Sequence, residues 1–194
     1  MKIMAFDLAT VTGVAIGDSQ SIPLCHTERL GQVGAPHGAR LSEALYMTSR
    51  LIKQHQPDAI AIEAPVIAGV KGGQDRALLA IGLRSAVVMM AHMRGVRCVE
   101  YSVASIRKHF IGVGRLKRTE AKRRTMQRCK LLGWHVANDN EADAAAVWEY
   151  ARLKLTNTFT PPPAGLFEVD NERTAQHRSG ADDSRRSSAE KRSS

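Results

Sequence analysis

Hydrophobic and polar positions alternate in short runs over the first part of the chain. KIMAFDL (residues 2–8) and GVAIGD (13–18) are apolar runs separated by the turn-like ATVT, and HTERLGQV (26–33) alternates with a period of two. Short runs of this kind, bounded by polar or turn residues, are typical of strands. The pattern predicts three strands that pair in chain order as an antiparallel β-meander.

Hydrophobic positions next recur at the spacing of a helix. Residues 39–55 carry one apolar face, and Pro57 ends this predicted helix. The run DAIAIEAP (58–65) predicts a buried strand, and residues 75–95 predict a long apolar helix capped by Gly95. The apolar face of the first helix consists of Leu41, Ala44, Leu45 and Ile52, with Thr48 between them.

The remaining pattern adds one strand and three helices. VRCVEYS (96–102) predicts the strand, and the helices are expected over residues 102–110, 118–132 and 141–155. The order of elements is therefore β-β-β-α-β-α-β-α-α-α, which is typical of an α/β protein. The first three strands pair antiparallel and the later ones parallel, so we expect a mixed sheet with helices on both faces.

The chain changes character at TPPPAG (160–165). Pro, Ser, Arg and Asp dominate beyond this point, and hydrophobic periodicity is lost. A segment of this composition does not bury enough apolar surface to form a core. We expect one folded domain over residues 1–158 and a disordered tail over 159–194.

Composition changes the picture mainly through charge. The chain has 194 residues, 43% of them hydrophobic, with a formal net charge of +9 and a sequence pI near 9.9, which favours a polyanionic partner. The three cysteines form no C-x-x-C pair, which argues against a zinc site or a disulfide framework. No uncharged apolar run reaches about 18 residues. We expect a soluble, cytoplasmic protein that engages no membrane.

Three carboxylates stand where the chain turns from core to surface. Asp7 closes the first apolar strand, Glu63 closes the strand in DAIAIEAP, and Asp143 lies in the first turns of the last helix. Acids at two strand ends and a helix start can converge at one edge of a sheet. Such acids repel one another unless a cation neutralises them, and oxygen ligands of this kind select Mg²⁺ or Mn²⁺. Taken singly, each acid is better explained as a solvated strand end or helix cap, and only the set of three favours a metal site.

Four blocks of the sequence together resemble the RuvC-type Holliday junction resolvases. FDLATVTGVAIGD, DAIAIEAP and NEADAAAVW are similar to the three acidic segments of that family, and SIRKHFIGVGRLKRTEAKRRTMQRC is similar to its basic segment. The likeness extends over residues 1–155. It implies an RNase H-like α/β fold and a homodimeric crossover junction endodeoxyribonuclease that cuts two opposed strands of branched, four-way DNA.

The resemblance also implies the metal site. Carried over by position, Asp7, Glu63 and Asp143 are catalytic residues that hold two Mg²⁺ ions, with Mn²⁺ as a possible substitute. Two ions of this kind clamp the attacking and leaving oxygens of a phosphodiester. No nucleotide cofactor is expected.

The fourth ligand is left open. The family usually has Asp or His three residues before its last acid, where this chain has Asn140, which offers a carbonyl oxygen without charge. Asn140 is therefore a candidate ligand and catalytic residue, with Asp139 and Glu141 as alternatives. Glu141 also lies three residues after Asn138, the spacing of a capping box at a helix start.

Other positions depart from the family pattern. Ala9 stands where the family commonly has Gly, so the backbone there is expected to have an ordinary conformation. The loop APVIAGVKGGQ (64–74) contains no aromatic residue, although family members carry a junction-opening aromatic wedge after the second acid. The dimer would use the apolar helix over residues 75–90, whose pattern plain core burial explains equally well.

The basic segment has its own chemistry. Residues 107–130 contain ten Lys or Arg against the single acid Glu120, and they cover more than one helix face. This density suits a track for DNA phosphates, which releases counterions and makes binding salt-dependent. Lys117 or Lys122 would also stabilise the phosphate during cleavage. The candidate DNA contacts are Arg107, Lys108, Arg115, Lys117, Arg118, Lys122 and Arg123.

Three alternatives remain. DLATVTGVAIGD also resembles the first phosphate-binding hairpin of the actin and sugar-kinase superfamily, but the chain is short for a second nucleotide-binding lobe. An RNA-processing nuclease of the related YqgF type would use the same metal chemistry on another substrate. A junction-binding protein that has lost cleavage is the third alternative, and it is consistent with an uncharged Asn140.

Overall fold

The computed structural model describes residues 1–65 and 73–156. The tail expected over 159–194 and most of the loop at 64–74 lie outside these residues. The five strands are β1 (Lys2–Asp7), β2 (Val11–Asp18), β3 (Leu24–Arg29), β4 (Ala59–Glu63) and β5 (Arg97–Tyr101). The five helices are α1 (His37–His55), α2 (Gln74–Met93), α3 (Val103–Ile111), α4 (Arg118–Leu131) and α5 (Asp139–Thr156).

The described strands form one mixed sheet in the order β3-β2-β1-β4-β5. β1 pairs antiparallel with β2, and β2 pairs antiparallel with β3, whereas β4 pairs parallel with both β1 and β5. Short loops connect the antiparallel strands. The connections that lead into the parallel strands β4 and β5 contain α1 and α2, respectively. The element order and the mixed sheet predicted from the sequence are confirmed.

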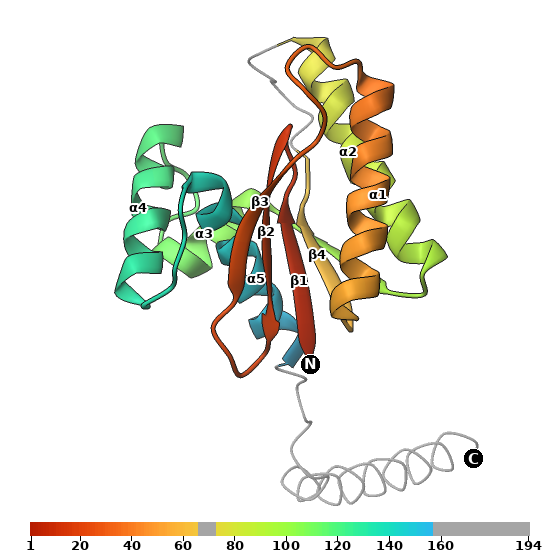
Figure 1. Cartoon of the computed structure of the whole chain (residues 1–194). Coiled ribbons are helices and arrows are strands. Elements are labelled where there is room, and N and C mark those ends of the chain that lie inside the picture. The colour runs from red at the N-terminus through yellow and green to blue at the C-terminus, as the bar shows by residue number, and fades with distance from the viewer. Residues whose placement is uncertain (66–72, 157–194) are drawn as a thin grey trace, which may run out of the picture. The chain divides into compact units, whose positions relative to one another are not determined.

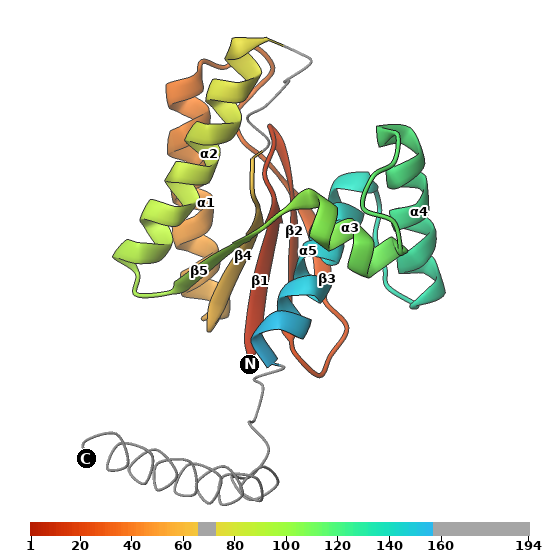
Figure 2. The ribbon, with the colours of Figure 1, turned by 180° about the vertical axis from the view of Figure 1, so that it is seen from behind.

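Helices cover both faces of this sheet (Figure 1). α1 and α2 pack on one face, where Phe6, Ile60 and Leu83 belong to the same buried cluster. On the other face α5 runs alongside the strands, with α3 and α4 outside it (Figure 2). Alternate residues of each central strand point to opposite faces, so both faces of β1 and β4 are buried and their sequences are almost continuously apolar.

The last helix packs tightly on the sheet because its inward side chains are small. Ala144 is fully buried and lies 3.2 Å from where a Cβ atom at Gly13 of β2 would be. Ala142, Ala145 and Ala146 are buried in the same cluster, which also includes side chains of α3 and α4. Further along α5, the fully buried Trp148 donates a hydrogen bond of 3.1 Å from its indole N–H to the carbonyl oxygen of Ile3. This bond fixes the C-terminal half of α5 to the start of β1.

The third strand was placed wrongly from the sequence. β3 spans Leu24–Arg29, two residues earlier than the predicted start at His26, and it ends before Leu30. Gly31 has a positive φ of 79°, which turns the chain away from the sheet. Leu30 is only 1% exposed whereas Val33 is 93% exposed, and both apolar residues lie after the end of β3 at Arg29.

The helix limits agree with the sequence to within two residues. Gly95 has a positive φ of 66° just after α2, in agreement with its predicted capping role. Ser102 caps α3 by accepting a hydrogen bond of 3.2 Å from the backbone N–H of Ser105. α1 buries Met47 and Leu51 in addition to Ala44, Thr48 and Ile52, while the predicted Leu41 and Leu45 are only partly buried.

α2 is apolar on more than its inner side. It is long and apolar enough by composition to cross a membrane, with a mean hydropathy of 1.3, yet only 22% of that window is buried. Leu83 and Val87 face the core, whereas Leu78, Met89 and Met93 are 55%, 50% and 69% exposed. Within the described chain, α2 therefore presents an outward apolar stripe that α1 and the sheet leave uncovered.

Candidate active site

The sheet topology brings two of the predicted acids to adjacent positions. β1 and β4 are parallel neighbours in a register that pairs Phe6 with Ile62, so the next residues, Asp7 and Glu63, end the two strands side by side. The carboxyl ends of parallel strands lie at the same edge of a sheet, which is where α/β proteins place their functional groups. Both side chains are partly buried at this edge.

The third acid reaches the same edge through a close contact of α5 with β2. Gly13 pairs with Asp7 across the β1–β2 ladder. A Cβ atom at Gly13 would lie 1.9 Å from the carbonyl oxygen of Asn140, so the first turn of α5 rests directly on the glycine backbone. Asp143 is on the following turn of the helix, and this contact therefore sets its position relative to Asp7.

The three carboxyl groups affect one another electrostatically. Burial and repulsion by Asp143 and Glu63 raise the pKa of Asp7 from 3.8 to about 7. Burial also raises the pKa of Glu63 from 4.5 to about 7, with a further contribution from Asp143. The pKa of Asp143 is raised as well, chiefly by burial. The site concentrates negative charge that the surrounding protein only partly compensates.

Three basic side chains supply that partial compensation. Lys122 lowers the pKa of both Asp7 and Asp143, and Arg107 lowers that of Glu63 and Asp143. Arg118 acts on Asp143 in the same direction. Cations of α3 and α4 therefore stand beside the acids that end β1 and β4.

The residues around Asn140 have separate partners. Lys122 forms an ion pair with Asp139, and this hydrogen bond lowers the pKa of Asp139. Glu141 is 6% exposed and closes the predicted capping box: its backbone N–H donates to the side-chain oxygen of Asn138 at 3.0 Å, and its carboxylate accepts from the Ala137 N–H at 2.7 Å. The capping role proposed for Glu141 is confirmed.

Asn140 differs from both neighbours. Its side chain makes no hydrogen bond to any residue within 1–65 or 73–156. Asp139 and Glu141 are already engaged, so among the three candidates for a fourth ligand Asn140 is the one left available by the described contacts.

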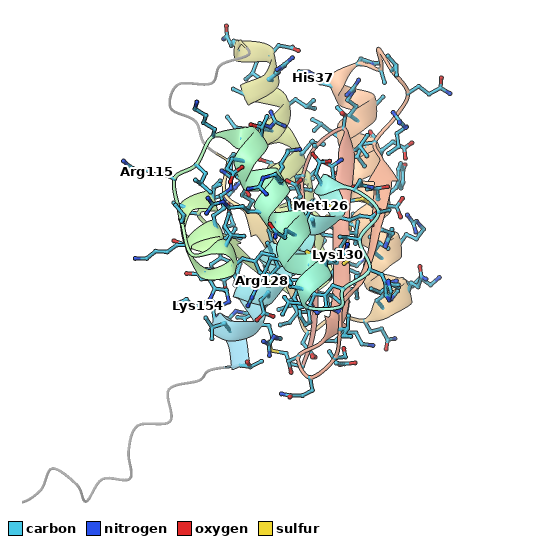
Figure 3. All side chains as sticks on the ribbon, turned by 90° about the vertical axis from the view of Figure 1, so that its left-hand side faces the viewer. His37, Arg115, Met126, Arg128, Lys130 and Lys154 are labelled. Carbon is cyan, nitrogen blue, oxygen red and sulfur yellow. The ribbon has the colours of Figure 1, made fainter. Side chains whose placement is uncertain are left out.

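The predicted DNA contacts fall into two groups. Arg107, Arg118 and Lys122 stand close enough to the acids to affect their pKa values, as described above. Lys108, Arg115 and Lys117 are exposed, and Arg123 pairs with Glu120 on the outer side of α4. Figure 3 looks onto α4, with Arg128 and Lys130 labelled on that helix and Arg115 labelled in the segment before it.

The described side chains do not by themselves form a complete metal coordination sphere. In the described ranges, no group of three or more His, Cys, Asp or Glu side chains is arranged closely enough to enclose an ion. Mg²⁺ sites rarely consist of protein ligands alone, because the ion keeps several waters and is usually held by one or two carboxylates and substrate phosphates. An oxygen-only donor set with raised carboxyl pKa values fits a hard divalent cation.

Two site features escaped the sequence analysis. The role of Gly13 as the contact point for α5 depends on a helix more than 120 residues later, and only its position opposite Asp7 in the hairpin offered a signal. The ion pair between Lys122 and Asp139 was also missed, because it requires that α4 and α5 lie together. Ala9 does not have a positive φ, which confirms the ordinary backbone expected there.

The chain is similar in sequence to curated RuvC proteins. It is 31% identical over 111 residues to crossover junction endodeoxyribonuclease RuvC of Shewanella sp. strain ANA-3 and to that of Shewanella pealeana. The aligned region covers 57% of this chain and 62% of each relative, so the chain spans about three fifths of their length. No family model matches the chain.

Solved structures share its fold. The structure titled T. thermophilus RuvC in complex with Holliday junction substrate matches with a TM-score of 0.63 at 19% identity, over 80% of this chain and 94% of that one. The yeast mitochondrial Holliday junction resolvase Ydc2 matches with a TM-score of 0.56 at 13% identity, over 81% and 82% of the two chains. The RNase H-like fold and the resemblance to RuvC-type resolvases are confirmed.

Replacing Gly13 by Ala tests the contact that positions α5. The added methyl group meets backbone atoms rather than a flexible side chain, so the helix must move. We expect a loss of about 1–3 kcal/mol in the free energy of unfolding, measured by chemical denaturation. Gly38→Ala is the matched control, because nothing lies within 4 Å of that position in α1 and the change should be neutral or stabilising. Equal stabilities for the two variants would contradict the proposed role.

The raised pKa of Asp7 predicts how stability depends on pH. Between its unfolded value of 3.8 and its folded value of about 7, the native state binds a proton that the unfolded state has lost, so stability falls as pH rises. In EDTA, Asp7→Asn should therefore raise the midpoint of thermal unfolding at pH 8 by about 3 °C or more, with a much smaller gain at pH 4.

The exposed Glu43 on α1 provides the control for that measurement. Glu43→Gln should leave the pH dependence of the unfolding temperature close to that of the parent. A pH dependence unaltered by Asp7→Asn would show that Asp7 ionises normally in the folded protein.

Proposed function

We propose that this protein is a metal-dependent endonuclease that resolves four-way DNA junctions by paired nicks. The observation that carries the proposal is the meeting of Asp7, Glu63 and Asp143 at one sheet edge, beside the cations of α3 and α4. Its likeness to RuvC supports the junction as substrate, since one structural neighbour is a RuvC in complex with a Holliday junction substrate.

In this proposal Asp7, Glu63, Asp143 and Asn140 hold two Mg²⁺ ions, or Mn²⁺ in their place. The chemistry that the bound ions supply is activation of a water and neutralisation of charge on the phosphodiester. The carboxylates contribute by being fixed on a rigid sheet edge and on a helix that packs directly on it. Asn140 contributes a neutral oxygen, which gives the cluster one negative charge fewer than a fourth carboxylate would.

The basic residues near the acids would receive the scissile phosphate. Lys122 is held by Asp139 next to Asp7 and Asp143, so its ammonium is already placed where a phosphate oxygen would approach. Arg107 stands beside Glu63 and can neutralise negative charge on the scissile phosphate. Each is a cation positioned before the substrate arrives, which is the condition for electrostatic stabilisation of a transition state.

The exposed cations of α3, of α4 and of the segment between them would hold the junction arms. Lys108, Arg115 and Lys117 lie at the surface and are free to contact phosphates, and Arg123 is exposed while paired with Glu120. Such contacts position DNA without reading its sequence, and each one adds to the salt dependence of binding. The basic balance of the chain, with a net charge of +9, supports the same class of partner.

A second copy of the chain would supply the second nick. Paired cuts on opposed strands require two sites, and closed two-fold assemblies are the commonest way to present them. The outward stripe of α2 offers apolar surface for such a contact, in which Leu78, Met89 and Met93 would be covered. We propose that a second copy rather than lipid covers this stripe, and that the protein acts in the cytoplasm.

One alternative has an observation in its favour. Asn140 stands where the related nucleases usually have Asp or His, so a junction-binding protein with an incomplete metal site is the second candidate. An RNA-processing nuclease with the same acids is distinguished by its substrate.

The first test is cleavage of a labelled four-way junction beside matched linear duplex and RNA, in Mg²⁺ or EDTA. We expect paired nicks confined to the junction, dependent on the metal, and at least about 100-fold slower for Asp143→Asn. Asp18→Asn is the control. It makes the same change at the end of β2, where Asp18 pairs with Lys2 at the start of β1 and therefore lies far from Asp7. Tight junction binding without cleavage in either Mg²⁺ or Mn²⁺ would favour the binding protein.

The second test concerns the dimer. Met89→Glu places a charge in the middle of the α2 stripe and should convert a dimer into monomers at micromolar concentration, measured by light scattering. The paired nicks should then become single, uncoupled nicks. Tyr46→Glu makes the same kind of change at an exposed apolar side chain on α1, 72% exposed, and should leave the dimer intact. A parent protein that is monomeric, or a Met89→Glu protein that stays dimeric, would contradict the proposed interface.

A further inference from the structure

A cavity lies beside the second half of α5, away from the acids. It encloses about 380 Å³ between the β2–β3 turn, the C-terminal parts of α3 and α4, and the second half of α5. This volume is within the range of about 300–1,000 Å³ found for small-ligand sites. Glu149 in its wall follows Asp143 by six residues, which places the cavity about 9 Å along the helix from the acid cluster.

One side of the cavity is aromatic and rigid. The rings of Phe110 and Trp134 stack with centroids 5.8 Å apart, and Trp134 meets Trp148 edge to face at 5.9 Å. Trp148 is fully buried and bonded to the carbonyl oxygen of Ile3. Trp134 is only partly buried, so its indole is the aromatic group that an occupant of the cavity can reach.

The charged groups of the cavity leave one cation unengaged. Arg152 donates two hydrogen bonds, of 2.8 and 2.7 Å, to the carboxylate of Glu149, and His109 lies 3.9 Å from the same carboxylate. Arg128 is exposed in the last turns of α4 and makes no side-chain hydrogen bond or ion pair with any residue of the described ranges. An anionic group in the cavity would therefore meet Arg128 without having to break an existing contact.

We propose that this cavity binds one unpaired nucleotide of a DNA strand, with its base against Trp134 and its phosphate on Arg128. Aromatic side chains and a basic groove are the two components of sites for single-stranded nucleic acid. An inorganic anion would use Arg128 but would gain nothing from the aromatic wall. A neutral apolar ligand would gain nothing from Arg128, so the nucleotide is the class that uses both.

The location on α4 links the cavity to the cutting site. Arg128 follows Lys122 by six residues on the same helix, about 9 Å along its axis and about 120° around it. A DNA strand advances about 3.4 Å per nucleotide, so a strand that passes Lys122 reaches Arg128 within about three nucleotides. This step rests on the proposed function, and it would give the nuclease a means of selecting a base near the cut, which the phosphate contacts alone do not provide.

The protein's own tryptophan fluorescence can be used to detect binding in this cavity. It contains two tryptophans, Trp134 and Trp148, and both line the cavity. Titration of the full chain with each of the four deoxynucleoside 5′-monophosphates in EDTA should produce a saturable change in tryptophan fluorescence. The matching nucleosides should bind at least about tenfold more weakly, and inorganic phosphate at the same concentrations should cause no change.

Substitutions at Arg128 provide the second arm. Arg128→Gln should weaken monophosphate binding at least about tenfold, the effect of losing a hydrogen bond to a charged group, whereas Arg128→Lys should restore part of it. Arg128 is exposed, so these variants should unfold at the parent temperature. Arg97→Gln makes the same change at an exposed position on β5. This strand is the outermost one on the side of the sheet away from β3, so the substitution should leave binding unchanged.

The proposal is overturned if no monophosphate gives a saturable change, if inorganic phosphate gives the same change, or if Arg128→Gln binds as well as the parent. The titration needs neither metal nor cleavage, so its outcome is independent of the proposed function. Junction cleavage without monophosphate binding would remove only the nucleotide site. Monophosphate binding without junction cleavage would remove only the resolvase.

Discussion

The site depends on how closely α5 can approach the sheet. Ala144 carries the smallest side chain that still favours a helix, and Gly13 removes even the Cβ atom at the point of contact. Larger residues on either surface would hold the helix away from β1 and β2. Asp143 would then move away from Asp7 and Glu63, which are fixed by the strands themselves. Close packing is therefore the condition under which three acids from three elements form one cluster.

This cluster is costly to the protein that contains it. Partly buried carboxyl groups that repel one another destabilise the folded state whenever they ionise, and their raised pKa values express that cost. Lys122 and Arg107 reduce the cost without removing it. A fully neutralised cluster would have little affinity for a cation or a phosphate-bound ion, so incomplete compensation is consistent with a binding role. The capping of α5 by Asn138 and Glu141 stabilises the element on which this unfavourable group is carried.

The sequence revealed the acids because each one stands at a local transition. Asp7 and Glu63 end apolar runs and Asp143 follows a capping box, so strand ends and helix starts could be located without knowing the fold. The contacts of Lys122 with Asp139 and of Gly13 with Asn140 depend instead on which distant elements meet, and no local pattern records that. Leu30 and Val33 show the same limit on a smaller scale. Both belong to the run HTERLGQV, which predicts one strand, but Gly31 turns the chain between them.

The bond from Trp148 to Ile3 joins residues that are 145 positions apart in the chain. β1 is made first, yet one of its faces is covered only when α5 has been made and has docked. Contacts of such long range are formed late because a large loop must close before they become favourable. The helix that brings the last acid is also the helix that completes the core, so a chain that has not finished folding cannot assemble the acid cluster. If the proposed nuclease activity depends on this cluster, an incompletely folded chain would have none of it.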